Sequence, residues 1–146
     1  GGVIGAVSGS SYVEIENVSA STADMKNSNT TSVGGLVGKL NDGFLNVGNV
    51  TITTADDNDL ANGADQVEGH GGLIGHLVKG VLRLQGETNL ENQKITTAYN
   101  HVGQIVGFNE NGLIYTLGNG NSLDADGKGF RYWKLGGCDS TWGKSV

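Results

Sequence analysis

The stretch Gly34-Gly35-Leu36-Val37-Gly38 decides the fold, because it recurs with small changes at four places in the chain. The other copies are Gly1-Gly2-Val3-Ile4-Gly5, Gly71-Gly72-Leu73-Ile74-Gly75 and Gly103-Gln104-Ile105-Val106-Gly107. The closing glycines of successive copies are 33, 37 and 32 residues apart. A repeat at this period is typical of a stack of similar units rather than of a globule with one cleft. We refer to the four copies as the glycine phrases.

An alternating strand follows each glycine phrase, and in the last three copies a tight turn precedes it: Asn41-Asp42-Gly43, Lys79-Gly80 and Asn109-Glu110-Asn111-Gly112. In the second copy Leu45 and Val47 flank Asn46, and a period of two with one apolar face predicts a half-buried strand. The apolar pairs expected to point inward are Val13/Ile15, Leu45/Val47, Leu82/Leu84 and Ile114/Thr116. The residues expected to point outward are Glu14, Asn46, Arg83 and Tyr115.

A second strand is recognisable in the first two copies only, with Val18/Ala20 and Val50/Ile52 facing inward. Stacking of the phrases predicts two further columns of apolar side chains. The first column is Val3, Leu36, Leu73 and Ile105, and the second is Ile4, Val37, Ile74 and Val106. The surrounding glycines let the backbone turn and let neighbouring units approach where no side chain fits. Residues 22–31, 54–69 and 91–100 are polar and are interpreted as surface loops.

The composition favours an all-β fold. The chain of 146 residues has 26 glycines and no proline, and only 16% of its residues are charged. Glycine weakens helices, whereas Thr, Val and Asn suit strands joined by polar turns. We therefore predict a right-handed parallel β-helix, or β-solenoid, of about four rungs at residues 1–122, with a C-terminal cap at residues 123–146. The cap should pack Phe130 and Trp133 on the last rung, because the end of a solenoid otherwise exposes its core and a strand edge.

Charge and hydropathy exclude several classes of partner. The formal net charge is −6, which argues against a nucleic-acid interface. No apolar run is long enough to span a bilayer, so we expect no membrane insertion by this segment. The single cysteine, Cys138, excludes an internal disulfide framework. The sequence opens inside a glycine phrase without a Met, so we expect it to be part of a longer protein.

The phrase Gly-Gly-Leu-Val-Gly, followed by an Asn/Asp-Gly turn and an alternating strand ending in Asn49-Val50-Thr51, resembles the GLUG repeat. That repeat occurs in large bacterial surface and secreted proteins. These include filamentous-haemagglutinin-like adhesins and the non-catalytic regions of surface-anchored immunoglobulin A peptidases. The resemblance covers residues 1 to about 122, and Gln104 departs from it in the fourth copy. It implies a β-helical, extracellular segment built from repeats, and it implies no catalytic residue.

Polar residues at turns suggest two kinds of site, each with a simpler alternative. Asp124 and Asp126 overlap part of a calcium-loop pattern and are the candidate calcium ligands, although the closing Glu of an EF-hand is missing. A solvated turn is the alternative, because Asp-Gly is turn chemistry. Asn17 and Asn49 each begin an Asn-x-Ser/Thr triplet. We interpret them as corner residues whose amides bond the neighbouring stretch of chain.

The histidines and carboxylates do not form a recognisable catalytic group. Glu14 and Glu16 are both expected outside, but the matching positions of later copies supply no second carboxylate. His70 and His101 precede the third and fourth phrases at similar places, without further ligands to complete a metal site. His76 is expected on the outside of the third phrase.

These observations favour a non-catalytic structural or adhesive repeat module of an exported bacterial cell-surface protein, located at the cell surface or outside the cell. The expected partners are adjoining domains of the same polypeptide and a host glycan or protein. No cofactor is expected apart from the candidate calcium ion. The alternative is a polysaccharide-active β-helix enzyme or the accessory domain of a surface peptidase, in which Glu14 and Glu16 would be the residues to test.

Overall fold

In the computed structural model of the chain, the structure describes residues 1–22, 32–54, 59–62, 69–91, 94–96, 102–103 and 105–117. The regular elements within these ranges are all strands, and none is a helix. The strands are β1 (Ile4–Val7), β2 (Tyr12–Thr22), β3 (Ser32–Gly34), β4 (Val37–Leu40), β5 (Phe44–Thr54), β6 (Asp59–Asn62), β7 (Gly69–Gly71), β8 (Ile74–Glu91), β9 (Lys94–Thr96), β10 (Val102–Gly103) and β11 (Val106–Leu117).

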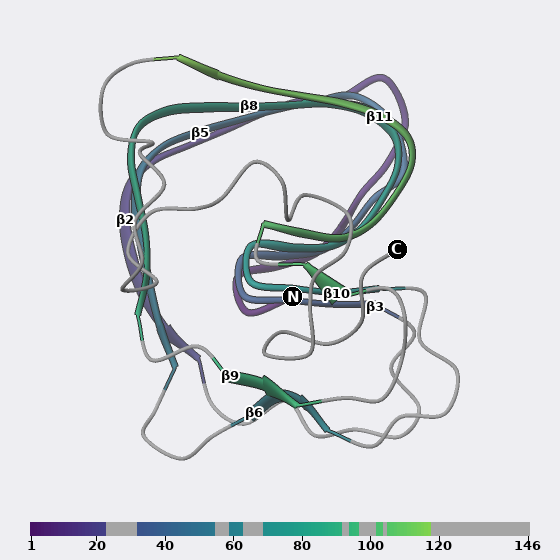
Figure 1. Cartoon of the computed structure of the whole chain (residues 1–146). Helices are drawn as coiled ribbons and strands as arrows, with labels where there is room; N and C mark the ends of the chain where they lie inside the picture. Colours follow the sequence, from purple (N-terminus) through teal and green to yellow (C-terminus); the bar gives the residue numbers. More distant parts are fainter. Residues whose placement is uncertain are drawn as a thin grey trace.

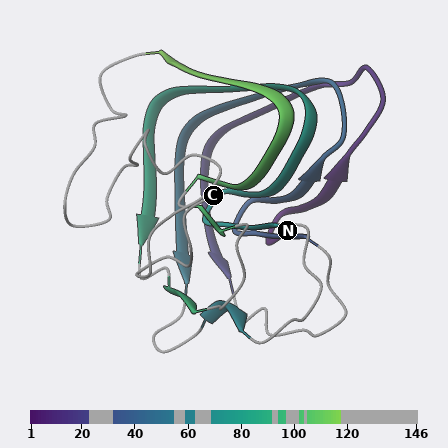
Figure 2. The ribbon, with the colours of Figure 1, turned by 45° about the vertical axis from the view of Figure 1, so that its right-hand side comes forward.

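Every strand pairing is parallel. The main sheet has the order β1-β4-β8-β5-β2, with β11 also paired to β8, and two smaller sheets join β10-β7-β3 and β6-β9. Figure 1 shows the strands following one nearly closed curve, and Figure 2 shows successive passes of the chain lying side by side. The all-β prediction is confirmed, and parallel strands in a nearly closed curled sheet are consistent with a β-solenoid.

We call the described parts of the successive passes levels 1 to 4. They comprise residues 1–22, residues 32–54, residues 69–91, and residues 102–103 with 105–117. Each later level begins with a short strand of the small sheet, β3, β7 or β10, and then enters its glycine phrase. The chain reverses direction at the phrase, close to the N-terminus in Figure 1, and leaves along β4, β8 or β11.

Glycine is required at this reversal because backbone lies where a side chain would be. A Cβ atom on Gly75 would lie 2.6 Å from the Gly38 carbonyl oxygen and 2.6 Å from the Val33 nitrogen. On Gly34 it would collide with the carbonyl oxygen of Val37 within the same turn. The outgoing strand of one level therefore packs directly on the incoming strand and the phrase of the level before it.

Backbone hydrogen bonds repeat from level to level at the turn. The Leu36 carbonyl accepts hydrogen bonds from the N–H groups of Val3 and Ile4, at 3.1 and 2.9 Å. The Leu73 carbonyl accepts from Leu36 and Val37 of level 2, at 2.9 Å each. The Ile105 carbonyl accepts in the same way from level 3. The tight turn thus keeps its backbone groups paired although it is buried, as a buried backbone must.

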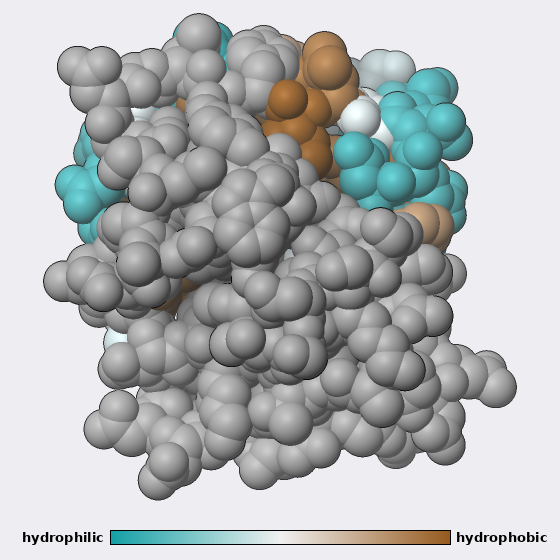
Figure 3. Space-filling model, viewed as in Figure 1, coloured by the Kyte–Doolittle hydropathy of each residue, from teal (hydrophilic) through white to brown (hydrophobic). Residues whose placement is uncertain are grey.

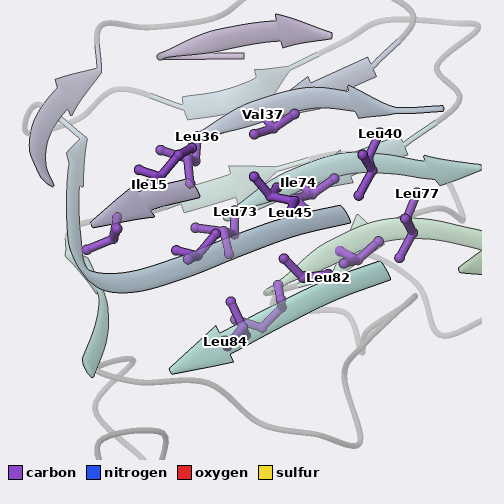
Figure 4. Packing of buried hydrophobic residues seen from close by; sticks show 14 of the residues in the cluster. Ile15, Leu36, Val37, Leu40, Leu45, Leu73, Ile74, Leu77, Leu82 and Leu84 are labelled. Carbon is purple, nitrogen blue, oxygen red and sulfur yellow. The ribbon is translucent and has the colours of Figure 1, made fainter. Parts of the chain in front are cut away.

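The interior is filled by columns of aliphatic side chains, as the alternation predicts. Leu45, Val47, Leu82 and Leu84 are fully buried, and β5 pairs with β8 so that Leu45 faces Leu82. The register also places Ile4, Val37, Ile74 and Val106 in one column. Figure 4 shows Leu45, Leu82 and Leu84 pointing into one interior together with Leu36, Leu73 and Ile74 of the phrases.

The turn between phrase and strand is as predicted in the second and third copies. Gly43 and Gly80 have φ angles of 101° and 110°, which favour glycine, whereas Gly112 of the fourth copy has no positive φ. The Asp42 carboxylate accepts a hydrogen bond from the Gly43 N–H at 2.8 Å.

Three predictions about solvent exposure are wrong. Asn46 is only 2% exposed and Arg83 is half-buried, although both were expected outside. In-register parallel strands lie about 4.8 Å apart, so outward side chains of the middle levels cover one another. His76 is also buried, because Phe108 and Glu110 of level 4 pack against it.

The sequence analysis missed several strands, including the second strand of level 3 and the pair β6 and β9. Level 3 does contain the second strand, with Thr88 and Leu90 in register with Val50 and Ile52. The register shifts between Gly48 and Val50 because level 3 has one more residue at this corner, and that extra residue obscured the repeat. Residues 54–69 and 91–100, expected to be loops, contain the parallel pair β6 and β9. The predicted cap, residues 123–146, lies outside the described residues.

The core columns predict the effect of a truncation. Leu82→Ala should lower the free energy of unfolding by about 2–5 kcal/mol, because Leu82 is fully buried and its neighbours Leu45 and Ile114 are held by the backbone ladder. Val3→Ala, at a site that is 47% exposed, is the matched control and should cost much less. Urea unfolding of the two variants checks this, and equal losses would contradict the assigned core.

Candidate functional site

The upper wall in Figure 1 carries aromatic, charged and amide side chains on its outward positions. This wall is built from the first halves of β2 and β5, the middle of β8 and the second half of β11, paired in register. Its inward residues fill the core, so its remaining side chains form outward columns. The described members are Tyr12, Phe44, Val81 and Leu113 in an apolar column, Glu14, Asn46 and Arg83 in a second, and Glu16, Gly48 and Gln85 in a third.

The apolar column is exposed at both ends. Tyr12 is 63% exposed and Leu113 is 59% exposed. The rings of Tyr12 and Phe44 stack with their centroids 5.3 Å apart and their planes 16° apart. Figure 3 shows apolar surface beside hydrophilic surface at this upper edge of the molecule. Exposed aromatic surface next to polar groups is typical of contact sites.

The second column contains two buried polar atoms that lack hydrogen-bond partners. Asn46 donates from Nδ2 to Glu14 Oε1 at 3.4 Å, but its Oδ1 has no partner. Arg83 Nε, one level further along the same column, also has none. An unpaired buried donor or acceptor costs about 1–3 kcal/mol. This column is therefore the least satisfied polar part of the described wall.

In the third column, a hydrogen bond skips a level. Gln85 Nε2 of level 3 donates to Glu16 Oε1 of level 1 at 2.9 Å. Gly48 lies between them in register and leaves the space open, since a Cβ there would be 3.3 Å from Gln85 Cγ. Both carboxylates of the wall, Glu14 and Glu16, are thus held by side-chain amides in the structure.

A separate cluster links levels 3 and 4 at His76. Its Nε2 lies 3.0 Å from Glu110 Oε1, and its ring stacks on Phe108 with centroids 4.9 Å apart. Register places Phe108 on one side of His76 and Lys39 on the other. The sequence analysis missed this cluster because His76 and its partners Phe108 and Glu110 belong to different levels and lie far apart in the chain.

The corner that joins the two walls of levels 1 to 3 uses asparagine or glycine. Asn17 and Asn49 have φ angles of 54° and 51°, and Gly86 has 66°. Asn49 Nδ2 donates to Asn17 Oδ1 at 3.3 Å, and the Glu87 N–H donates to Asn49 Oδ1 at 3.1 Å. The interpretation of Asn49 as a corner residue that bonds neighbouring levels is confirmed.

The other residues proposed from the sequence are distributed as follows. The candidate calcium ligands Asp124 and Asp126 lie outside the described residues, and so does His101. His70 lies in β7 and is 1% exposed. Within the described ranges, no group of three or more His, Cys, Asp or Glu residues is placed to hold a metal ion. The same ranges contain no helix that could cross a membrane.

Comparison with known proteins found no match, whether with protein-family models, with curated proteins or with solved structures. The resemblance to the GLUG repeat therefore stays a prediction from the four glycine phrases.

The His76 cluster predicts an effect on stability. Glu110→Ala should lower the free energy of unfolding by about 1–3 kcal/mol, because it removes the carboxylate from a buried ring nitrogen. Glu110→Gln is the control, since its amide oxygen can accept the same hydrogen bond and should restore most of the loss. Thermal melting of both variants tests this. A wild-type melting temperature for Glu110→Ala would show that the contact contributes nothing.

Proposed function

We propose that this chain is a non-catalytic structural and adhesive repeat module of an exported bacterial cell-surface protein. In this proposal it is a right-handed β-solenoid of about four rungs, closed by residues 123–146, and it works at the cell surface or outside the cell. It belongs to the GLUG type of repeat. Its partners are adjoining domains of its own polypeptide and a host glycan or protein.

One observation carries the proposal: the same contacts recur from level to level. The turn hydrogen bonds to the Leu36, Leu73 and Ile105 carbonyls are equivalent, and so are the glycine contacts and the core columns. Outward side chains, in contrast, differ from level to level, as at Tyr12, Phe44 and Val81. A regular scaffold with a varied surface suits presentation and contact, as in other stacked repeats.

The outer wall is the contact surface we assign to this function. It offers an exposed aromatic ring at Tyr12 beside acceptors on Glu14 and Glu16 and the donors of Arg83. These side chains sum to a charge of about −1, so a neutral glycan or a polar protein surface fits better than a polyanion. Asp124 and Asp126 are kept in the proposal as candidate calcium ligands.

An enzyme is the second candidate, and the exposure of Glu14 and Glu16 on one wall is the observation in its favour. Catalysis would require the two carboxyl groups to act on a substrate as an acid–base pair. In the structure each carboxylate instead accepts a hydrogen bond from a side-chain amide, Glu14 from Asn46 and Glu16 from Gln85. The non-catalytic reading is therefore preferred.

Binding and turnover assays separate the two candidates. The purified chain should bind at least one ligand on a glycan array or a panel of surface proteins. The double variant Tyr12→Ser/Phe44→Ser should weaken that binding at least about tenfold, because it removes the aromatic contact area. Ser21→Ala, on the other wall of the same strand β2, is the control and should leave binding unchanged.

The same preparation should turn over no polysaccharide or protein substrate. Turnover that is lost in Glu14→Gln or Glu16→Gln would replace the proposal with the enzyme. Binding that survives the Tyr12/Phe44 change would place the contact surface elsewhere on the chain.

A further inference from the structure

The edge of the stack at level 1 is open. Val3 is 47% exposed, whereas Leu36 and Leu73 of the same column are fully buried. Val13 is only half-buried, although Leu45 beside it is fully buried. β1 and β2 are the terminal strands of the main sheet, so their outer backbone groups pair with no other described strand.

Gly5 is the informative residue at this edge. A Cβ on Gly38 would lie 2.6 Å from the Gly5 carbonyl oxygen, and a Cβ on Gly75 would lie 2.6 Å from the Gly38 oxygen. The closing glycine of a phrase is thus forced by the closing glycine of the level before it. A Cβ on Gly5 would meet nothing within 4 Å, and the φ of Gly5 lies outside the left-handed region that favours glycine. Nothing in the described structure requires glycine at this position.

The carbonyl of Val3 shows the same asymmetry. Its equivalents, the Leu36 and Leu73 carbonyls, each accept two N–H groups from the level before. Level 1 has no described level before it, so the position equivalent to these acceptors faces the open edge. Gly5, the Val3 side chain and the Val3 carbonyl therefore match the residues that form the contacts between described levels. Their contact partners are not among the described residues.

We infer that a further level of the same kind packs on the outer side of β1 and β2. Its closing glycine places a carbonyl oxygen against Gly5, its N–H groups bond the Val3 carbonyl, and its apolar phrase residue covers Val3. This contact has the geometry already present between levels 1 and 2 and between levels 2 and 3.

The level is contributed by the same polypeptide rather than by a second copy of this chain. Every strand pairing between the described levels joins successive passes of one chain. A second copy stacked head to tail would need an open phrase at its level 4, but Ile105 and Val106 are fully buried. A free parallel edge also invites aggregation, which a covering level prevents.

The experiment measures whether Gly5 becomes necessary once a level is added. In the 146-residue chain, Gly5→Ala should shift the melting temperature by no more than about 2 °C, because the space is empty. The extended chain carries a copy of residues 32–70 joined directly before Gly1, so that Gly1 follows the copied strand as Gly71 does in the natural order. In the extended chain, Gly5→Ala should lower the melting temperature by about 5 °C or more.

Two controls accompany it. Gly38→Ala should destabilise both chains, because its clash is with level 1 in each. A shuffled copy of residues 32–70 at the same place should leave Gly5→Ala harmless. The inference is overturned if Gly5→Ala is harmless in the extended chain, or if it already destabilises the 146-residue chain. It is also overturned if only the shuffled extension folds, or if the 146-residue chain forms a dimer that Gly5→Ala abolishes, since the occupant would then be a second copy.

Discussion

The close approach of backbone to backbone at the glycine phrases is the constraint on which the rest of the structure depends. At Gly38 and Gly75 the carbonyl of the preceding level occupies the place where any other residue has its Cβ. This contact has no side chain to adjust, so it limits how the levels can sit on one another. The same register aligns the apolar columns, the outward columns of the wall and the corner asparagines.

Much of this arrangement was predictable because the interior obeys two local rules. Strict alternation at Leu45–Val47 and Leu82–Leu84 predicts inward pairs, and the phrase spacing predicts that they stack. Turn glycines such as Gly43 follow from sequence chemistry in the same way. These features depend on residues that are close together in the chain. Each feature also recurs in several copies, so one sequence provides several independent observations of it.

What the sequence did not predict depends on contacts between levels. The burial of Asn46 and His76 comes from neighbours about thirty residues away, and alternation within one strand says nothing about them. The second strand of level 3 was missed because one inserted residue broke the expected spacing. On the outer wall, the positions of Glu14, Glu16 and Arg83 were predictable from register, but the Gln85–Glu16 bond across Gly48 required the three-dimensional stack.

Level 3 has one extra residue opposite the corner between Gly48 and Val50, and this shows how the length of the stack is determined. Hydrogen bonding between parallel strands sets the advance from one level to the next at about 4.8 Å, whatever the number of residues in each level. Insertions bulge sideways at the corners and leave the axial advance unchanged. The length of the stack therefore depends on the number of levels and not on the number of residues in each level. A protein of this design can lengthen or diversify its lateral loops freely while whatever stands at its tip keeps the same height.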